Sequence, residues 1–335
     1  MVRRRQGGGD LTATAWVEMA VRGIDKVTPT VKAFDLASLG GQPLAAFEAG
    51  SHIKVEVRDR MGVRVSRDYS LVERNADGTW RIAVRFDPDG DGGSRYMHES
   101  VEVGTHLRCS PPANDFPLAE NAANSLLIAG GIGITPIFAM AGVLAARHQP
   151  FTLHYVARSR DDMAFSERLV ALAGDRVEFH EDDGNPQNGI PLNDILSRPG
   201  AYTHLYVCGP EGLIDDTLAA ARGHGWLGEF LHVERFAAPL PRADDHGIEV
   251  VLAKSQRTLH VPADRTILDM LIDDGIDPLY DCRKGTCGLC AQTVIETDGK
   301  IDHRDHFFGY GRALAGNQMC VCVSRITGGK LVLDL

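Results

Sequence analysis

The chain has 335 residues, of which 44% are hydrophobic and 24% charged, a composition typical of a globular protein with about two or three domains. Its net charge of −10 argues against a nucleic-acid partner, because phosphates are bound by clustered Lys and Arg. The longest apolar runs, Ser125 to Ala129 and Ile248 to Ala253, are much shorter than the roughly 18 to 20 residues of a membrane span. We therefore expect a soluble, cytoplasmic protein without a membrane segment, with a flexible tail at Met1 to Gly9.

Short strands are predicted in the first third of the chain, where runs of β-branched and aromatic residues are divided by Gly, Pro and Asp turns. These segments are Ala13 to Val21, His52 to Val57, Asp68 to Glu73 and Trp80 to Phe86. A series of short strands with tight turns favours an antiparallel β-barrel or sandwich.

After Pro111 and Pro112 the pattern changes to strands that alternate with helices. The apolar run Ser125 to Ala129 leads into a glycine-rich turn at Gly130 to Pro136, and Ile137 to Arg147 has a helical composition. Further strands are predicted at Phe151 to Ala157, Arg176 to His180 and His204 to Cys208. This alternation predicts a doubly wound parallel sheet, which binds ligands at the carboxyl ends of its strands.

The last third follows a charged segment that contains Pro and Gly, Ala237 to Gly247, which we interpret as an interdomain linker. From Ile248 the chain resumes with Val-rich strands and a helical segment, Thr266 to Asp274. The chain has seven cysteines, and most of them follow this helix. Such a cluster favours a metal site in a reducing compartment over a disulfide framework.

The cysteine spacing is the most specific signal in the sequence. Cys282, Cys287 and Cys290 have the C-x4-C-x2-C spacing of plant-type [2Fe-2S] ferredoxins, whose fourth cysteine lies farther along the chain. Zinc is the alternative, but only Cys287 and Cys290 have the CxxC spacing typical of zinc sites. Cys320 and Cys322 both remain candidates for the fourth ligand, because strand residues two apart face the same side. The loop contains small residues that let the backbone curl around a cluster: Gly285, Thr286 and Gly288.

The glycine-rich turn at Gly130 to Pro136 lies between a strand and a helix, where a pyrophosphate can approach backbone amides. An ordinary tight turn is the alternative. A second turn in the same domain, Cys208-Gly209-Pro210, ends another apolar strand at the edge where ligands bind. Taken alone, a cysteine such as Cys208 is more often a buried core thiol than a functional one.

A cation, an aromatic ring and a hydroxyl occur close together in Arg67-Asp68-Tyr69-Ser70-Leu71. Such a strand can bind a flavin phosphate through Arg67 and cover the flavin ring with Tyr69. The alternative is an edge strand whose Arg extends along the surface.

In this order the three motifs resemble the phthalate dioxygenase reductase family, which includes the reductase subunits of vanillate demethylases and related Rieske oxygenases. The resemblance covers nearly the whole chain. It implies a multidomain protein with an FMN-binding antiparallel β-barrel at residues 10–117 and an NAD(P)H-binding α/β domain with a parallel sheet at 118–238. A plant-type [2Fe-2S] ferredoxin domain of the α+β, β-grasp type is implied at 248–335.

The resemblance also implies roles for individual residues. Arg67 is expected on the flavin phosphate and Tyr69 against the isoalloxazine, with further flavin contacts from Ser70, Val84, Arg85, Gly92, Gly93 and Ser94. The segment Asn114 to Leu118 resembles the one that leads out of the flavin domain. Nucleotide contacts are expected from Gly130, Gly131, Gly133, Thr135, Cys208, Gly209, Pro210 and Phe236, with Thr135 and Cys208 nearest the path of the hydride. The cluster ligands are expected to be Cys282, Cys287, Cys290 and Cys322, because Val323-Ser324-Arg325 follows Cys322 as it does the family's last ligand.

The implied function is that of an NADH-dependent reductase. A hydride carries two electrons whereas a [2Fe-2S] cluster takes one, so a flavin is needed between them. FMN is expected rather than FAD, and NADH rather than NADPH, although Arg158, Ser159 and Arg160 could hold a 2′-phosphate. The expected partner is a terminal Rieske-type oxygenase.

Two other functions remain open at this point: a reductase for another acceptor such as a cytochrome P450, and a non-catalytic flavin and iron–sulfur redox sensor. Aspartates that precede the cysteine loop are a candidate docking face for the acceptor, with a solvated helix face as the alternative. They are Asp269, Asp273, Asp274, Asp277 and Asp281.

Overall fold

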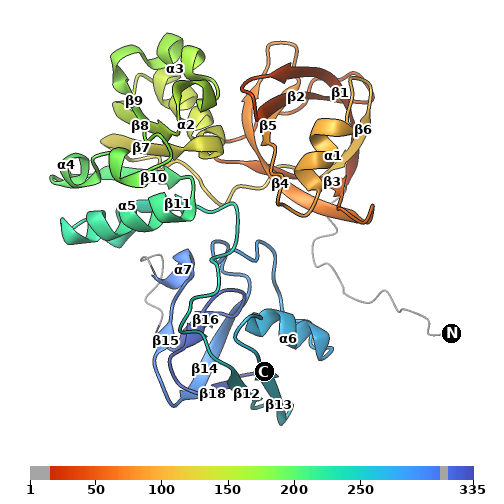
Figure 1. The fold of residues 1–335 in the computed structure, drawn as a ribbon, viewed down its shortest axis with the longest axis vertical. Coiled ribbons are helices and arrows are strands. Elements are labelled where there is room, and N and C mark those ends of the chain that lie inside the picture. The colour runs from red at the N-terminus through yellow and green to blue at the C-terminus, as the bar shows by residue number, and fades with distance from the viewer. Residues whose placement is uncertain (1–15, 310–315) are drawn as a thin grey trace. The chain divides into compact units, whose positions relative to one another are not determined.

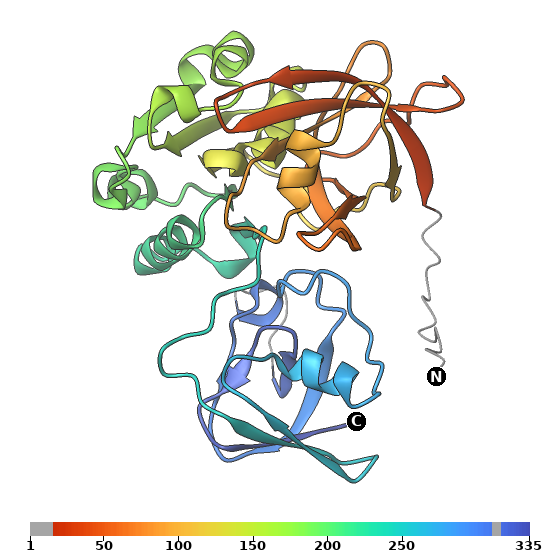
Figure 2. The same ribbon diagram turned by 45° about the vertical axis from the view of Figure 1, so that its right-hand side comes forward.

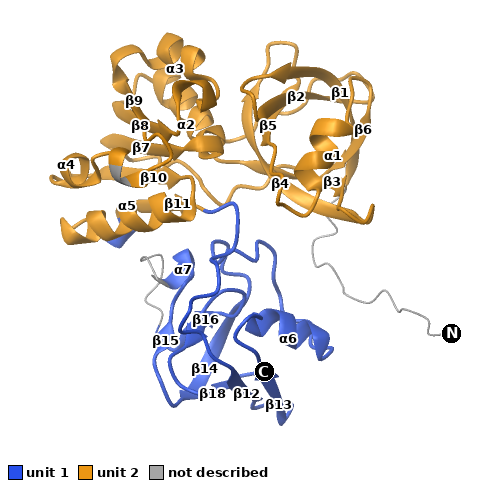
Figure 3. Ribbon diagram, in the orientation of Figure 1, with its two compact units in different colours: residues 1–11, 227–229, 235–335 blue, residues 12–226, 230–234 orange. Residues whose placement is uncertain are grey.

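The computed structural model describes residues 16–309 and 316–335 (Figure 1). The predicted tail at Met1 to Gly9 lies outside these residues. The described chain forms two compact units (Figure 3), which we call the N-terminal unit, with its main part Thr12–Trp226, and the C-terminal unit, with its main part Arg235–Leu335. No helix in the described ranges combines the length and the apolar character that a membrane crossing requires.

The N-terminal unit begins with a closed six-stranded antiparallel barrel in the order β1-β2-β5-β4-β3-β6. In strands such as β3, alternate residues point into the barrel: Ile53, Val55 and Val57 are buried, whereas Lys54 and Glu56 are less so. The predicted antiparallel barrel is confirmed. Its elements are β1 (Val17–Lys26), β2 (Val31–Ser38), β3 (His52–Arg58), β4 (Arg64–Arg74), β5 (Trp80–Arg85), α1 (Gly93–Glu99) and β6 (His106–Cys109).

The same unit continues with a five-stranded parallel sheet in the order β11-β10-β7-β8-β9, which confirms the predicted α/β fold. Helices α2 and α3 cover one face of this sheet and α4 and α5 the other (Figure 1). The strands are β7 (Asn124–Gly130), β8 (Phe151–Ala157), β9 (Val177–Glu181), β10 (Thr203–Cys208) and β11 (Leu231–Glu234). The helices are α2 (Ile134–Ala146), α3 (Ser166–Ala173), α4 (Leu192–Leu196) and α5 (Glu211–Gly223), with short 3₁₀ turns at Gly131–Gly133, Arg160–Asp162, Gly174–Arg176, Pro186–Asn188 and Gly228–Phe230.

The barrel and the parallel sheet share one buried core, in which Val72 of β4 belongs to the same cluster as Phe138 of α2. At the edge of this contact, Arg168 of α3 donates two hydrogen bonds, of 2.6 and 2.5 Å, to the carboxylate of Glu73 on β4. The shared core and this bidentate ion pair fix the barrel against the helices α2 and α3.

The C-terminal unit has a five-stranded mixed sheet in the order β13-β12-β18-β14-β16 and a short two-stranded sheet, β15-β17. Strands β12 and β18 run parallel, and α6 lies across the sheet (Figure 2), which is the predicted α+β ferredoxin architecture. Apolar residues of α6, Ile267, Leu268 and Leu271, are buried in the core of this unit. The elements are β12 (Ile248–Leu252), β13 (Arg257–Val261), α6 (Ile267–Asp273), β14 (Ala291–Thr297), β15 (Ile301–Asp302), α7 (His306–Gly309), β16 (Gln318–Cys320), β17 (Arg325–Ile326) and β18 (Lys330–Leu333).

Candidate functional site

The predicted flavin strand is part of β4, and its polar side chains lie at the rim of the barrel. The hydroxyl of Ser70 is buried and has no hydrogen-bond partner among the described residues. A buried hydroxyl left unpaired is costly unless a ligand or water satisfies it. Burial raises the pKa of Tyr69, so its phenol keeps its proton and can donate a hydrogen bond. Both features fit a bound polar ring system such as a flavin.

Arg67 lies beside the predicted turn at Gly92 to Ser94. Its guanidinium donates to the carboxylate of Asp91 at 3.1 Å, and a β-carbon added to Gly93 would lie 3.1 Å from the Arg67 side chain. Gly92 has a left-handed backbone with φ of 100°, and a β-carbon there would lie 2.5 Å from the amide nitrogen of Arg60. This crowded backbone next to a guanidinium fits a phosphate.

Of the other predicted flavin contacts in the barrel, Val84 and Ser94 have side chains that are already engaged within the protein. The Val84 side chain is buried in the barrel core, so this residue can contact a ligand only through its backbone, whereas Arg85 is exposed. The hydroxyl of Ser94 accepts a hydrogen bond from the backbone N–H of Asp87 at 3.0 Å. His98 was not predicted from the sequence; its ring donates to the Val84 carbonyl at 2.8 Å and thereby connects α1 to β5. Burial lowers the pKa of His98.

The two turns that were predicted to bind the nucleotide lie against each other at the carboxyl end of the parallel sheet. A β-carbon on Gly133 would collide with the carbonyl of Cys208, and one on Gly130 would lie 2.7 Å from the ring of Pro210. The α-carbon of Gly130 is also 3.0 Å from the place of a β-carbon on Gly209. Glycine is therefore required at these positions for the backbones to approach, and the two turns pack into one continuous backbone surface.

The polar side chains at these turns mainly support the backbone. Thr135 is buried, and its hydroxyl donates to the carbonyl of Ile132 at 3.0 Å. Cys208 is fully buried within the core of the domain. The hydroxyl of Tyr155 on β8 donates to the carbonyl of Gly131 at 3.1 Å, a contact that the sequence did not predict. Tyr155 thus holds Gly131 in its left-handed conformation, with φ of 50°.

Two of the three residues considered for a 2′-phosphate are engaged elsewhere. The hydroxyl of Ser159 donates to the carboxylate of Asp162 at 2.8 Å. The guanidinium of Arg160 stacks 3.6 Å above the ring of Phe179. Arg158 is exposed. Phe236, predicted to close the nucleotide domain beside the flavin, is 38% exposed and belongs to the C-terminal unit, so its relation to β4 stays a prediction.

The cysteine loop is tightly curved at two glycines. Gly285 and Gly288 have φ of 75° and 76°, in the region that favours glycine. A β-carbon on Gly285 would lie 2.8 Å from the backbone of Asp305, and one on Gly288 would overlap the ring of Phe307. The loop therefore curls as predicted, and its small residues are a steric requirement.

The sulfur atoms of this loop are surrounded by hydrogen-bond donors. The backbone N–H groups of Lys284 and Cys287 donate to the sulfur of Cys282 at 3.3 and 3.5 Å. A hydrogen bond from the neighbouring Cys287 thiol and these backbone donors lower the pKa of Cys282. Neighbouring thiols, first Cys320 and then Cys322, likewise lower the pKa of Cys290. Donors that stabilise thiolates fit an iron–sulfur cluster, whose sulfur atoms accept such bonds.

The two candidates for the fourth ligand differ in their neighbours. Both thiols are buried and both bond to Cys290. Cys322 also interacts with Cys282 and with the backbone of Gly285, whereas Cys320 lies next to the carboxylate of Asp305. The expectation that both cysteines lie on one strand was wrong, because β16 ends at Cys320 and Cys322 follows in a turn. Cys322 is therefore the thiol that contacts both Cys290 and the backbone of Gly285 in the loop.

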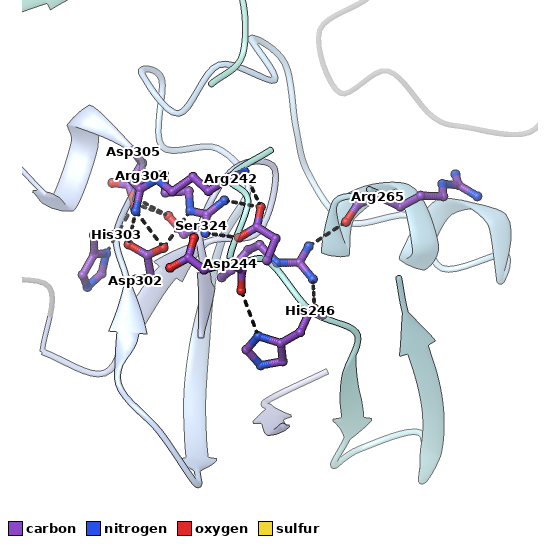
Figure 4. Close-up of polar contacts among 11 residues, drawn as sticks. Arg242, Asp244, His246, Arg265, Asp302, His303, Arg304, Asp305 and Ser324 are labelled. Carbon is purple, nitrogen blue, oxygen red and sulfur yellow. Dashed lines mark hydrogen bonds and ion pairs between the residues drawn. The ribbon is translucent and has the colours of Figure 1, made fainter. Parts of the chain in front are cut away.

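A polar network that includes Asp305 and Ser324 (Figure 4) is connected to the cysteine loop. The carboxylate of Asp305 is fully buried and accepts from the hydroxyl of Ser324 at 2.6 Å and from the backbone N–H of Phe308 at 2.5 Å. The backbone N–H of His306 donates to the carbonyl of Gly285 at 2.8 Å. The Asp305 segment thus holds one glycine of the cysteine loop directly.

The same network anchors the end of the predicted linker. Arg304 donates to both carboxylate oxygens of Asp245, at 2.8 and 2.5 Å, and to Asp302 at 2.7 Å (Figure 4). This pairing lowers the pKa of Asp245 to about 2. Arg242 adds an ion pair to Asp302 at 3.2 Å. The linker interpretation therefore needs a correction: residues 242–245 are bound to the C-terminal unit and are not a free connection.

The predicted acidic docking face is largely neutralised. Asp269 pairs with Arg283 at 3.1 Å, Asp273 pairs with Arg265 at 2.6 Å, and Asp274 pairs with Arg257. Asp269 also accepts from the hydroxyl of Thr266, which caps α6. These three aspartates are therefore paired within the C-terminal unit, and docking by the acidic face stays a prediction.

Two family profiles match the chain: the 2Fe-2S iron-sulfur cluster binding domain over residues 250–327, and the N-terminal domain of the dimethylamine monooxygenase subunit DmmA-like over residues 105–229. The chain is 40% identical over 322 residues to the vanillate O-demethylase oxidoreductase of Pseudomonas sp. (strain HR199 / DSM 7063), covering 95% of this chain and 100% of that protein.

Two solved structures are similar over nearly the whole chain. One is phthalate dioxygenase reductase, a modular structure for electron transfer from pyridine nucleotides to [2Fe-2S]. It is 32% identical to this chain with a TM-score of 0.66, and the match covers 96% of this chain and 98% of that chain. An intact type IV self-sufficient cytochrome P450 monooxygenase is 37% identical with a TM-score of 0.73, covering 96% of this chain and 41% of that longer chain.

Proposed function

Because the chain belongs to the family of phthalate dioxygenase reductase-like oxidoreductases, which use a flavin and a [2Fe-2S] cluster, we propose that it is the reductase component of a Rieske-type oxygenase or demethylase. In this role it takes hydride from NADH to FMN and passes single electrons through the cluster to a separate oxygenase protein. The substrate of the oxygenase then never contacts this chain.

The cysteine loop is the observation that carries the proposal. Cys282, Cys287 and Cys290 lie on a loop in which two backbone N–H groups donate to the sulfur of Cys282, and Cys322 contacts Cys290 and the backbone of Gly285. We assign these four thiols as the cluster ligands. Gly285 and Gly288 shape the loop, and Asp305 and Ser324 hold it in place.

The flavin is assigned to the rim of the barrel. Arg67 and the backbone of Gly92 and Gly93 would hold its phosphate, while Ser70 and Tyr69 would contact the ring. Arg85 and the backbone of Val84 and Ser94 complete the proposed contacts. When bound, the flavin accepts the two electrons of a hydride together and releases them one at a time to the cluster. The choice of FMN over FAD rests on the family.

The nucleotide is assigned to the paired turns. The peptide groups of Gly130, Gly131 and Gly133 would receive the pyrophosphate at the start of α2, and Gly209 and Pro210 would border the nicotinamide. Thr135 and Cys208 act as positioning residues for the hydride path, since no general acid or nucleophile is required. Phe236 is proposed to close the site beside the flavin.

NADH is the proposed donor, because the side chains of Ser159 and Arg160 are committed to Asp162 and Phe179. The free thiols among the described residues support a reducing, cytoplasmic location. Docking of the oxygenase is assigned to the surface around the cysteine loop, where Leu279 and Leu289 are 58% and 51% exposed.

The acceptor is tested with purified protein, NADH and a set of candidate acceptors. A Rieske-type oxygenase should be reduced faster than a cytochrome P450 at equal concentration, and chromatography of the released flavin should identify FMN. Slow NADH oxidation with every acceptor, artificial dyes included, would favour the redox sensor and contradict the proposal.

A haem protein is the second candidate acceptor. The similarity to a self-sufficient cytochrome P450 monooxygenase, with a TM-score of 0.73, supports it. In that case the same assay would show rapid reduction of the haem acceptor and slow reduction of the Rieske centre. The NADH, flavin and cluster sites would be unchanged, since only the docked protein differs.

A further inference from the structure

A group of histidine and carboxylate side chains lies in the N-terminal unit, away from the paired glycine turns. His154 is in β8, and Glu178 and His180 are in the neighbouring strand β9, where His154 is directly opposite Glu178. Because side chains alternate along a strand, these three residues face the side of the sheet opposite to Tyr155 and Phe179. They therefore project from one face of two hydrogen-bonded strands.

The ligand atoms of these side chains converge. The Nδ1 atom of His154 is 3.1 Å from the Nε2 atom of His180 and 3.5 Å from a carboxylate oxygen of Glu178, and all three ligand atoms lie within 4.8 Å of one another. Two zinc–nitrogen bonds of about 2.0–2.1 Å at a tetrahedral angle separate their nitrogens by about 3.4 Å. The observed spacing is therefore close to that around a single metal ion.

We propose that His154, Glu178 and His180 form a binding site for a transition-metal ion such as Zn²⁺, separate from the cysteine loop. Two imidazoles and one carboxylate form a donor set that suits Zn²⁺ and also Cu²⁺. Within the described ranges, this is the one group of His, Cys, Asp and Glu whose ligand atoms converge in this way.

The surroundings let an ion enter. The side chain of His154 is 5% exposed, whereas that of Glu178 is 60% exposed. The site is therefore buried at His154 and open to solvent on the side of Glu178. Water can occupy the remaining coordination position from that side.

Without a metal ion, the close approach of the two imidazoles is explained by a hydrogen bond. The Nδ1 atom of His154 and the Nε2 atom of His180 are 3.1 Å apart, and between two neutral rings one nitrogen donates and the other accepts. A bound ion replaces this bond and links β9, at the edge of the sheet, to β8. The site is independent of the proposed electron path, since none of its residues belongs to the turns, the flavin strand or the cysteine loop.

The test uses the oxidised holoprotein without a histidine tag. Calorimetry with Zn²⁺ should show one ion bound per chain, and EPR of added Cu²⁺ should show hyperfine splitting from two imidazole nitrogens. His180→Gln should weaken Zn²⁺ binding about tenfold or more and reduce the splitting to that of one nitrogen. Glu178→Gln, at an exposed position, should weaken binding without loss of fold.

The matched control is His232→Gln. His232 and His204 form a similar pair in the same sheet, in which the Nδ1 atom of His204 is 2.8 Å from the Nε2 atom of His232. This variant should keep the wild-type affinity for Zn²⁺. If the wild type bound no Zn²⁺, or if His180→Gln and Glu178→Gln bound it as tightly as the wild type, the site would not exist. EPR of the reduced cluster before and after Zn²⁺ addition should be the same, which shows that the cysteines are not the site.

Discussion

Gly133 packs directly against the backbone of Cys208, so that the turn after β7 and the turn after β10 form one surface at the carboxyl end of the parallel sheet. The two residues are far apart in the sequence but are brought together because β7 and β10 are neighbours in the sheet. A side chain at Gly133 would separate them, because its β-carbon would collide with the Cys208 carbonyl. This contact gives the proposed nucleotide site its shape.

Gly133→Ala is expected to disrupt that site. The added methyl group collides with the Cys208 carbonyl, so the turns must separate, at a cost of about 1–3 kcal/mol in stability. Reduction of the flavin by NADH in stopped-flow measurements should slow about tenfold or more.

Gly142→Ala is the control, because a β-carbon there meets no atom within 4 Å. It should keep the rate and gain about 0.5–1 kcal/mol, as expected for Ala in a helix. Equal effects of the two changes would contradict the role of this contact.

The fourth cluster ligand can be identified by single substitutions. Cys322→Ala should lower iron content and abolish the EPR signal of the reduced cluster, because Cys322 interacts with both Cys282 and Cys290. Cys320→Ala should keep both, apart from a small loss of stability where its buried side chain is removed. The reverse result would assign the ligand to Cys320.

The ion pair between Asp245 and Arg304 should make stability depend on pH in the acid range. The folded pKa of Asp245 is about 2, below its ordinary value of 3.8, so the pair stabilises the fold above pH 4, by about 1 kcal/mol once solvent screening is included, and this contribution is lost as the pH falls toward 2. Asp245→Asn should therefore be less stable than wild type in urea unfolding at pH 7, and the difference should shrink between pH 4 and 2. Asp244→Asn should match wild type at each pH. A difference that stayed constant with pH would exclude this ion pair as its cause.

NADH should be preferred over NADPH. Ser159 and Arg160 are held by Asp162 and Phe179, so a 2′-phosphate would have to displace a hydrogen bond and a stacked ring. The ratio of kcat/KM values should favour NADH about tenfold or more. A preference for NADPH would show that these side chains reorient to bind the phosphate.

The sequence predicted best where one local pattern decides the structure. β8 was predicted with its observed bounds, and the curled cysteine loop followed from Gly285 and Gly288. β2 was missed because it is buried on both faces: Val31 and Ala33 belong to the core shared with α2, whereas Phe34 and Leu36 fill the barrel. A strand of this kind lacks the simple alternation of apolar and polar residues.

Contacts between segments that are distant in the sequence could not be predicted from the sequence pattern. Nothing in the pattern around Asp305 indicates that Ser324 donates to it, and the stacking of Arg160 on Phe179 depends on the pairing of β8 with β9. For the metal group, Glu178 and His180 have the two-residue spacing of a strand face, but His154 joins them only through the sheet. The cysteine spacing predicted a [2Fe-2S] domain, which the family match over residues 250–327 supports, because Cys282, Cys287 and Cys290 share one loop.

The central claim is tested most directly by anaerobic titration of the purified protein with NADH, followed by visible absorbance and low-temperature EPR. The account predicts that about three electrons are taken up per chain, two by the flavin and one by the cluster, with a rhombic signal from the reduced [2Fe-2S] cluster. Uptake of about two electrons without a cluster signal, or zinc in place of iron, would contradict it.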